Sequence, residues 1–180
     1  MILPVHQYSV NILFWDQWDF FIPLFNEENL WKVFRYLHSP HRQGIGFVID
    51  KFILDWSNWD TRVESFFLVG VMIFAALLAI LIKYKISRKI TFADIIIPLI
   101  FLNASAFSTY AQVPNPSHGV FPVLIVLIFC ICFFIKNPYL KHTIIALINF
   151  LGINTAMEQE LNSLILNITF RVKSFGKNAI

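Results

Sequence analysis

Two aspartates stand three residues apart in the aromatic stretch FWDQWDF, residues 14–20. On a helical turn, side chains at this spacing project from one face, so Asp16 and Asp19 could hold a metal ion together, or one of them could accept a proton. The surrounding aromatic rings would exclude water and strengthen such interactions. The simpler interpretation is that both acids are solvated at the polar edge of a membrane-surface segment, and the residues alone leave both interpretations open.

A second group, HSPHR at residues 38–42, brings His38, His41 and Arg42 together. Two histidines three residues apart on a helix could share a metal ion, but Pro40 disfavours a regular helix and the spacing fixes no third ligand. An arginine beside histidines also suits a phosphate group, which a guanidinium binds through two parallel hydrogen bonds. Alternatively, these residues form a polar turn that meets lipid headgroups.

Secondary candidates lie just before a long apolar run and in a later loop. The charged residues of WSNWDTRVE, residues 56–64, could carry chemistry or simply mark a membrane boundary. The loop STYAQVPNPSHG, residues 108–119, could face the same surface, although a turn rich in proline and asparagine also explains its composition. The secondary candidates are Asp60, Arg62, Glu64, Gln112 and Asn115.

The composition is typical of a membrane protein. Of the 180 residues, 57% are hydrophobic and 14% are charged, whereas roughly a quarter of the residues of a soluble domain are charged. Residues 1–64 hold eight acidic and five basic side chains, and residues 65–180 hold three acidic and nine basic ones. The two parts should therefore face different compartments. Because the basic residues flank apolar runs, we expect no nucleic-acid binding.

Apolar runs predict an all-α integral membrane bundle with about four transmembrane helices. A helix needs about 20 apolar residues to cross the hydrocarbon core, and residues 66–82 form the clearest candidate. Further spans are predicted near residues 90–110, 120–135 and 142–157. The basic cluster at residues 83–89 should be cytoplasmic, because positive charge beside a span sets its orientation.

Residues 1–64 are then predicted to lie along the outer surface, and residues 65–180 to form the transmembrane region. All five tryptophans belong to the first part, and indole rings favour the boundary between headgroups and hydrocarbon. Two amphipathic helices are expected there, one capped by Asn26 and one over residues 44–56 with Asp50 on its polar side. The expected location is a bacterial inner membrane, with the outer segment in the periplasm.

The order of FWDQWDF, HSPHR and WSNWDTRVE before a long apolar helix resembles the opening of polytopic bacterial membrane proteins of the GT-C glycosyltransferase type. The resemblance covers roughly residues 12–82, and more weakly AQVPNPSHG and the helix after it. It implies sugar transfer from a polyprenyl-phosphate donor, with Asp16 or Asp19 as the general base or as the carboxylate that organises a divalent cation. The residues that would face the donor phosphate are His38, His41 and Arg42.

The chain departs from the family pattern in two respects. Pro40 stands where the pattern has an acid, and the helix that precedes the outer loop in the family is absent. We therefore expect a truncated relative. The alternative function is that of a non-catalytic membrane protein, a subunit, scaffold or remnant, whose charged outer segment only anchors it. Membrane lipids are the expected partners in both cases, with a polyprenyl-phosphate sugar in the first and other membrane subunits also possible.

Overall fold

A computed structural model describes residues 2–13, 17–38, 41–103, 105 and 116–153, and most of these residues are helical. The chain begins its described part with the short helix α1 (Ile2–Tyr8). Six elements follow in this part: α2 (Gln17–Phe20), α3 (Ile22–Phe25), α4 (Leu30–Arg35), β1 (Leu37–His38), β2 (His41–Arg42) and α5 (Gly44–Ser57). We call residues 17–57 the head. The remaining elements are α6 (Thr61–Ser87), η1 (Phe92–Ile95), α7 (Ile96–Phe101), η4 (Pro116–Val120), α8 (Phe121–Cys132) and α9 (Pro138–Ile153).

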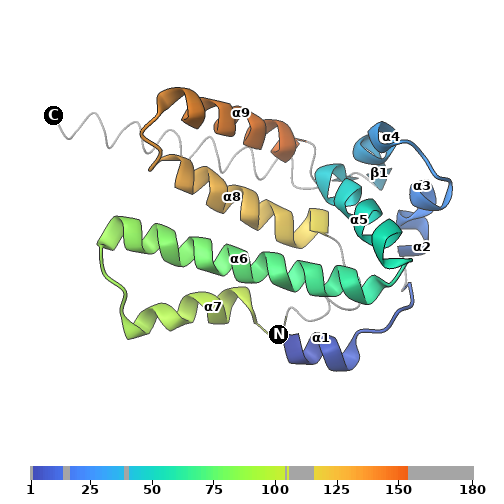
Figure 1. The fold of residues 1–180 in the computed structure, drawn as a ribbon, viewed down its shortest axis with the longest axis horizontal. Coiled ribbons are helices and arrows are strands. Elements are labelled where there is room, and N and C mark those ends of the chain that lie inside the picture. Colours follow the sequence, from blue (N-terminus) through green and yellow to red (C-terminus); the bar gives the residue numbers. More distant parts are fainter. Residues whose placement is uncertain (1, 14–16, 39–40, 104, 106–115, 154–180) are drawn as a thin grey trace.

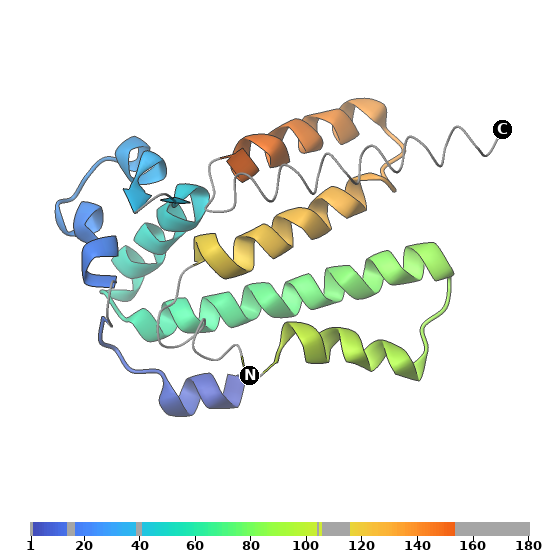
Figure 2. The ribbon, with the colours of Figure 1, turned by 180° about the vertical axis from the view of Figure 1, so that it is seen from behind.

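The longer helices run side by side and the head covers one end of them. Across the molecule the order is α7, α6, α8, α9; α6 and α8 run away from the head, and α7 and α9 run back towards it (Figure 1). Figure 2 shows the same order from behind, with α1 lying beside the beginning of α6. The predicted all-α class is therefore confirmed for the described residues.

Among the described helices, α6 alone is long and apolar enough to cross a membrane. Its 27 residues extend about 40 Å at 1.5 Å per residue, which exceeds a hydrocarbon core of about 30 Å. The helix contains the predicted span at residues 66–82. It ends because Arg88 adopts a left-handed conformation with φ 56° and returns its N–H to the carbonyl of Tyr84.

The other predicted spans overlap helices that are shorter than α6. In the span near 90–110, η1 and α7 cover residues 92–101, Ser105 is also helical, and residues 104 and 106–110 lie outside the described residues. Thr91 and Asp94 cap the beginning of η1 reciprocally. α8 has 12 residues and α9 has 16, and residues 154–157 of the last predicted span lie outside the described residues. The described residues thus establish one membrane-length helix and a helical bundle around it.

An aromatic core holds the head together. Phe20, Phe21 and Phe47 are buried with Leu24, Val33 and Leu54, and the Phe20 and Phe47 ring centroids are 4.6 Å apart. Fully burying such side chains stabilises a fold by roughly 1.5–3 kcal/mol each, so this cluster accounts for short helices that would not persist alone.

The first amphipathic helix begins later than predicted. Its N-cap is Asn29, whose side chain accepts a hydrogen bond from the backbone of Lys32, whereas Asn26 closes α3. The predicted first turn after Asn26 does not form, because Asn26 closes α3 and Glu27 adopts a positive φ of 52°. α4 ends at Arg35, before Pro40 can interrupt it, and the chain turns into the β1–β2 ladder.

Candidate functional site

The structure brings the first two sequence motifs together at the surface of the head. The Phe20 ring meets the His38 ring edge-on, with centroids 5.7 Å apart. The Tyr36 hydroxyl donates a hydrogen bond to the carbonyl oxygen of Asp19 at 3.2 Å. Asp19 itself is exposed on α2, and its partner in the motif, Asp16, lies outside the described residues. The exposed Asp19 therefore lies one residue from a ring that contacts the histidine hairpin. The pairing of the Asp16 and Asp19 carboxylates stays a prediction.

The pKa of the Tyr36 hydroxyl is raised by its surroundings. Partial burial raises the pKa of its hydroxyl, and the negative charge of Asp19 raises it further. The hydroxyl therefore stays protonated at neutral pH and keeps its hydrogen bond to the Asp19 backbone.

HSPHR forms a two-stranded hairpin instead of a helical turn. His38 lies opposite His41, and Leu37 lies opposite Arg42. His38 and Arg42 are half-buried, and the side chain of His41 is outside what the structure describes. In a hairpin, directly opposed residues are neighbours, so the two histidines are brought close by strand pairing and not by helical spacing. Binding of a phosphate by His38, His41 and Arg42 stays a prediction.

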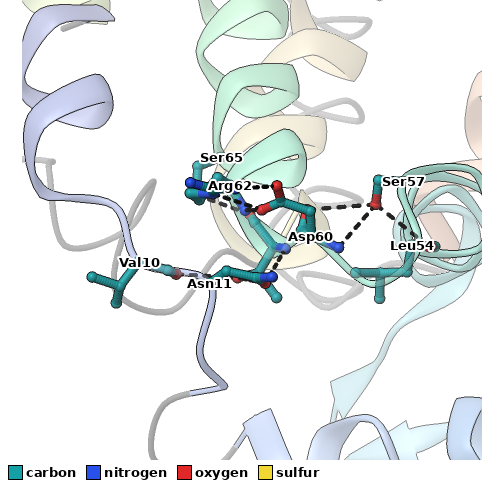
Figure 3. A network of polar contacts seen from close by, with 8 residues as sticks. Val10, Asn11, Leu54, Ser57, Asp60, Arg62 and Ser65 are labelled. Atoms are coloured by element: carbon teal, nitrogen blue, oxygen red, sulfur yellow. Dashed lines mark hydrogen bonds and ion pairs between the residues drawn. The ribbon is translucent and has the colours of Figure 1, made fainter.

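The third motif, WSNWDTRVE, contains the residues that begin α6. Asp60 caps this helix and forms a two-pronged ion pair with Arg62, with distances of 2.8 Å from Nε to Oδ1 and 2.6 Å from Nη2 to Oδ2. These hydrogen bonds lower the pKa of Asp60. Figure 3 shows the surrounding network, in which the Asp60 backbone N–H donates to Ser57. Asp60 and Arg62 neutralise each other, so this pair is explained by local structure.

The same network ties the N-terminal segment to α6. The Asn11 side chain accepts a hydrogen bond from the backbone N–H of Thr61 at 2.9 Å, and the Thr61 hydroxyl donates to the carbonyl of Val10 at 3.2 Å (Figure 3). Ser65 donates one turn further along to the carbonyl of Thr61. The bond to Asn11 satisfies one of the backbone N–H groups that a helix start leaves open.

Two carboxyl groups are fully buried where α5 packs on α6. Asp50 and Glu64 both have 0% exposure, and none of their four oxygens receives a hydrogen bond from the described residues. Burial and the neighbouring Glu64 carboxyl raise the pKa of Asp50 well above its usual range. Glu64 was a secondary candidate, but Asp50 was expected on the polar side of its helix. That expectation is wrong, and the helix is rotated so that Asp50 faces inward.

A spacing signal for Asp50 was present in the sequence. The buried residues of α5 include Phe47, Asp50 and Leu54, which recur at three and four positions as one helical face. The more apolar face, which carries Phe52 with 58% exposure, points outward instead. Aligning the helix on Phe47 and Leu54 would have placed Asp50 inside.

A close contact with η4 completes the inner face of α5. The Ser117 hydroxyl donates a hydrogen bond to the carbonyl of Gln43, and both residues are buried. A Cβ on Gly46 would lie 2.9 Å from the backbone nitrogen of Ser117. Glycine is therefore required here for η4 to approach the helix. Gln112 and Asn115, the loop candidates just before η4, lie outside the described residues.

No group of three or more metal-binding side chains occurs among the residues that the structure describes. A divalent cation at Asp19 would need ligands from Asp16, the His41 side chain or the substrate. Comparisons of the chain with protein-family models, with curated proteins and with solved structures give no match.

Proposed function

We propose that this chain is a membrane protein of the GT-C type that transfers a sugar from a polyprenyl-phosphate donor at the surface of its head. The contact between the Asp19 motif and the histidine hairpin carries this proposal, because the Phe20 ring, next in sequence to the exposed Asp19, meets the His38 ring, so that an acidic motif adjoins the group that contains His38 and Arg42. Transfer to a hydroxyl acceptor needs both: a base for the acceptor proton and positive partners for the departing phosphate.

In the proposed reaction, Asp19 takes the proton of the acceptor hydroxyl while that oxygen attacks the anomeric carbon. The bond from this carbon to the phosphate oxygen breaks, and the electron pair leaves with the polyprenyl phosphate. Arg42, His38 and His41 are the groups proposed to receive the phosphate, because a guanidinium and neighbouring imidazoles stabilise a phosphate monoester anion. Asp16 remains the alternative base.

The proposed topology has four spans, with residues 1–64 in the periplasm and the basic loop in the cytoplasm of a bacterial inner membrane. The direction of α6 supports it, since the acidic head adjoins the first turn and Lys83, Lys85 and Lys89 adjoin the last. Exposed apolar side chains on the shorter helices also suit contact with lipid, among them Ile96, Leu99, Ile100, Leu147 and Phe150.

Transfer of a radiolabelled hexose from its polyprenyl phosphate in isolated membranes tests this function. Replacing the acting base, in Asp19→Asn or Asp16→Asn, should lower transfer by about 10²–10⁴-fold, the usual contribution of general base catalysis. Asp55→Asn is the matched control, because Asp55 is another exposed acid of the head and pairs with Lys51. Full transfer by both single variants and by the double variant would remove the catalytic proposal.

The second candidate function is that of a non-catalytic subunit or scaffold anchored at the interface. Exposed aromatic side chains on the head support this candidate, among them Trp56 with 79% exposure. Tryptophan at the headgroup boundary holds a segment against a membrane. On this alternative the aspartate variants behave like wild type, and no labelled sugar leaves the donor.

A further inference from the structure

We propose that Asp50 and Glu64 form a proton-binding site between α5 and α6, in which one carboxyl is protonated and donates a hydrogen bond to the other. The bound proton would join the head to the membrane-length helix. This site is separate from the proposed transfer site and does not depend on it.

Burial and the lack of donors require the proton. Both side chains are completely buried, come from different helices, and receive no hydrogen bond from the described residues. A carboxylate accepts hydrogen bonds but cannot donate one. Two ionised carboxylates side by side would therefore repel each other without compensation, whereas one shared proton turns the contact into a charge-assisted hydrogen bond.

The charged groups on the surrounding elements are engaged elsewhere. On α5 itself Lys51 pairs with Asp55, and on α6 Arg62 pairs with Asp60. On α4, Lys32 pairs with Glu28, and the Arg35 guanidinium lies over the Trp31 ring. Arg42 of β2 is half-buried and pairs with neither acid, and the His118 side chain of η4 lies outside the described residues. No described cation therefore replaces the proton.

A proton fits this site better than a metal ion does. Zinc sites use three or four protein ligands and calcium takes six to eight oxygens. The described residues provide two carboxyls here and no third metal-binding side chain. The nearby Ser65 hydroxyl already donates to the carbonyl of Thr61.

Loss of the proton should weaken the packing of α5 on α6. The pKa of Asp50 is raised in the folded chain, so its favourable contribution is fully present at acidic pH. That contribution is lost as the pH rises through the folded-state pKa. Alkaline conditions should therefore loosen the head from α6 while the helices themselves remain.

Infrared spectroscopy of the full chain in lipid nanodiscs tests the site directly. Wild type should show the carbonyl stretch of a protonated carboxyl at neutral pH, and the band should shift in heavy water and disappear at alkaline pH. The double variant Asp50→Asn with Glu64→Gln, which keeps the shape of the pair without its ionisable groups, should lack the band. Asp55→Asn should keep it, because that exposed acid does not belong to the pair.

Thermal unfolding over the same pH range gives an independent reading. The melting temperature of wild type should fall as the pH rises from neutral, and that of the double variant should stay level. An absent band in wild type at neutral pH, or one that persists in the double variant, would overturn the proposal. So would restoration of the alkaline stability of wild type, but not of the double variant, by Na⁺ or Ca²⁺. The wild-type spectrum decides the matter even where the double variant does not fold.

Discussion

At the first turn of α6, one side chain caps the helix and binds a cation at the same time. The Asp60 carboxyl accepts three hydrogen bonds, all from Arg62, one of them from its backbone N–H. The ion pair is largely exposed to solvent, so it should contribute less than the cap. The carboxyl thus has a structural role at the start of α6.

Asp60→Ala should lower the free energy of unfolding by about 1 kcal/mol, the usual effect of removing a helix cap. Asp60→Asn should cost less, because its amide oxygen can still cap. The pKa of Asp60 is lowered in the folded chain, so its contribution is present above the ordinary carboxyl pKa and is lost as the pH falls through the folded-state value. Thermal unfolding at several pH values measures both effects. Equal losses in the two variants would show that the ion pair, and not the cap, stabilises the turn.

Among the elements, α5 shows what a sequence can and cannot predict for a membrane-surface helix. Its bounds were predicted to within about one residue, because the periodic apolar pattern is strong. Its orientation was wrong, with Asp50 inside and Phe52 outside. In a soluble protein the apolar face turns inward, but beside a lipid bilayer it can face lipid while polar residues pair inside the protein. Periodicity alone does not distinguish the two environments.

Contacts between distant residues explain the remaining differences. The neighbourhood of the Asp19 motif and His38 depends on the aromatic core and on the hairpin, which no local pattern reports. The resemblance placed both motifs in one outer loop, and the structure adds their contact. The beginning of η1 is likewise set by a local cap, Thr91 with Asp94, which an apolar run does not reveal.

Gly46→Ala should separate η4 from α5, because the new Cβ would lie 2.9 Å from the backbone nitrogen of Ser117. We expect a loss of about 1–3 kcal/mol in the free energy of unfolding, as for other overpacked sites. Gly70→Ala is the control: its Cβ would meet nothing within 4 Å, and alanine in a helix interior is favoured over glycine by about 0.5–1 kcal/mol. Denaturation in mild detergent compares the two. A Gly46→Ala variant as stable as Gly70→Ala would contradict the close approach.

At the scale of the whole molecule, the head and the basic loop lie at opposite ends of α6 (Figure 1). A bilayer around this helix would place them on different sides. The acidic excess of residues 1–64 and the basic excess of residues 65–180 agree with this separation, since positive charge is retained on the cytoplasmic side.

Cysteine labelling measures the orientation. With Cys130 and Cys132 replaced by alanine, Asp55→Cys should react with a membrane-impermeant maleimide in intact spheroplasts. Lys85→Cys should react only after the membrane is opened. The reversed pattern would invert the proposed topology, and labelling of both from one side would exclude α6 as a span.

The polar contacts of the head also set the order in which the protein can assemble. The Asn11 side chain can form its hydrogen bond only once Thr61, 50 positions later, has been made. The carbonyl of Gln43 likewise needs Ser117, 74 positions later. Contacts so far apart in the chain form slowly, even though closing a long loop adds little to the final free energy. During synthesis, α6 is therefore available for membrane insertion well before η4 can cover α5. The packing of the head should therefore be completed only after η4 has been made, although the head is translated before α6.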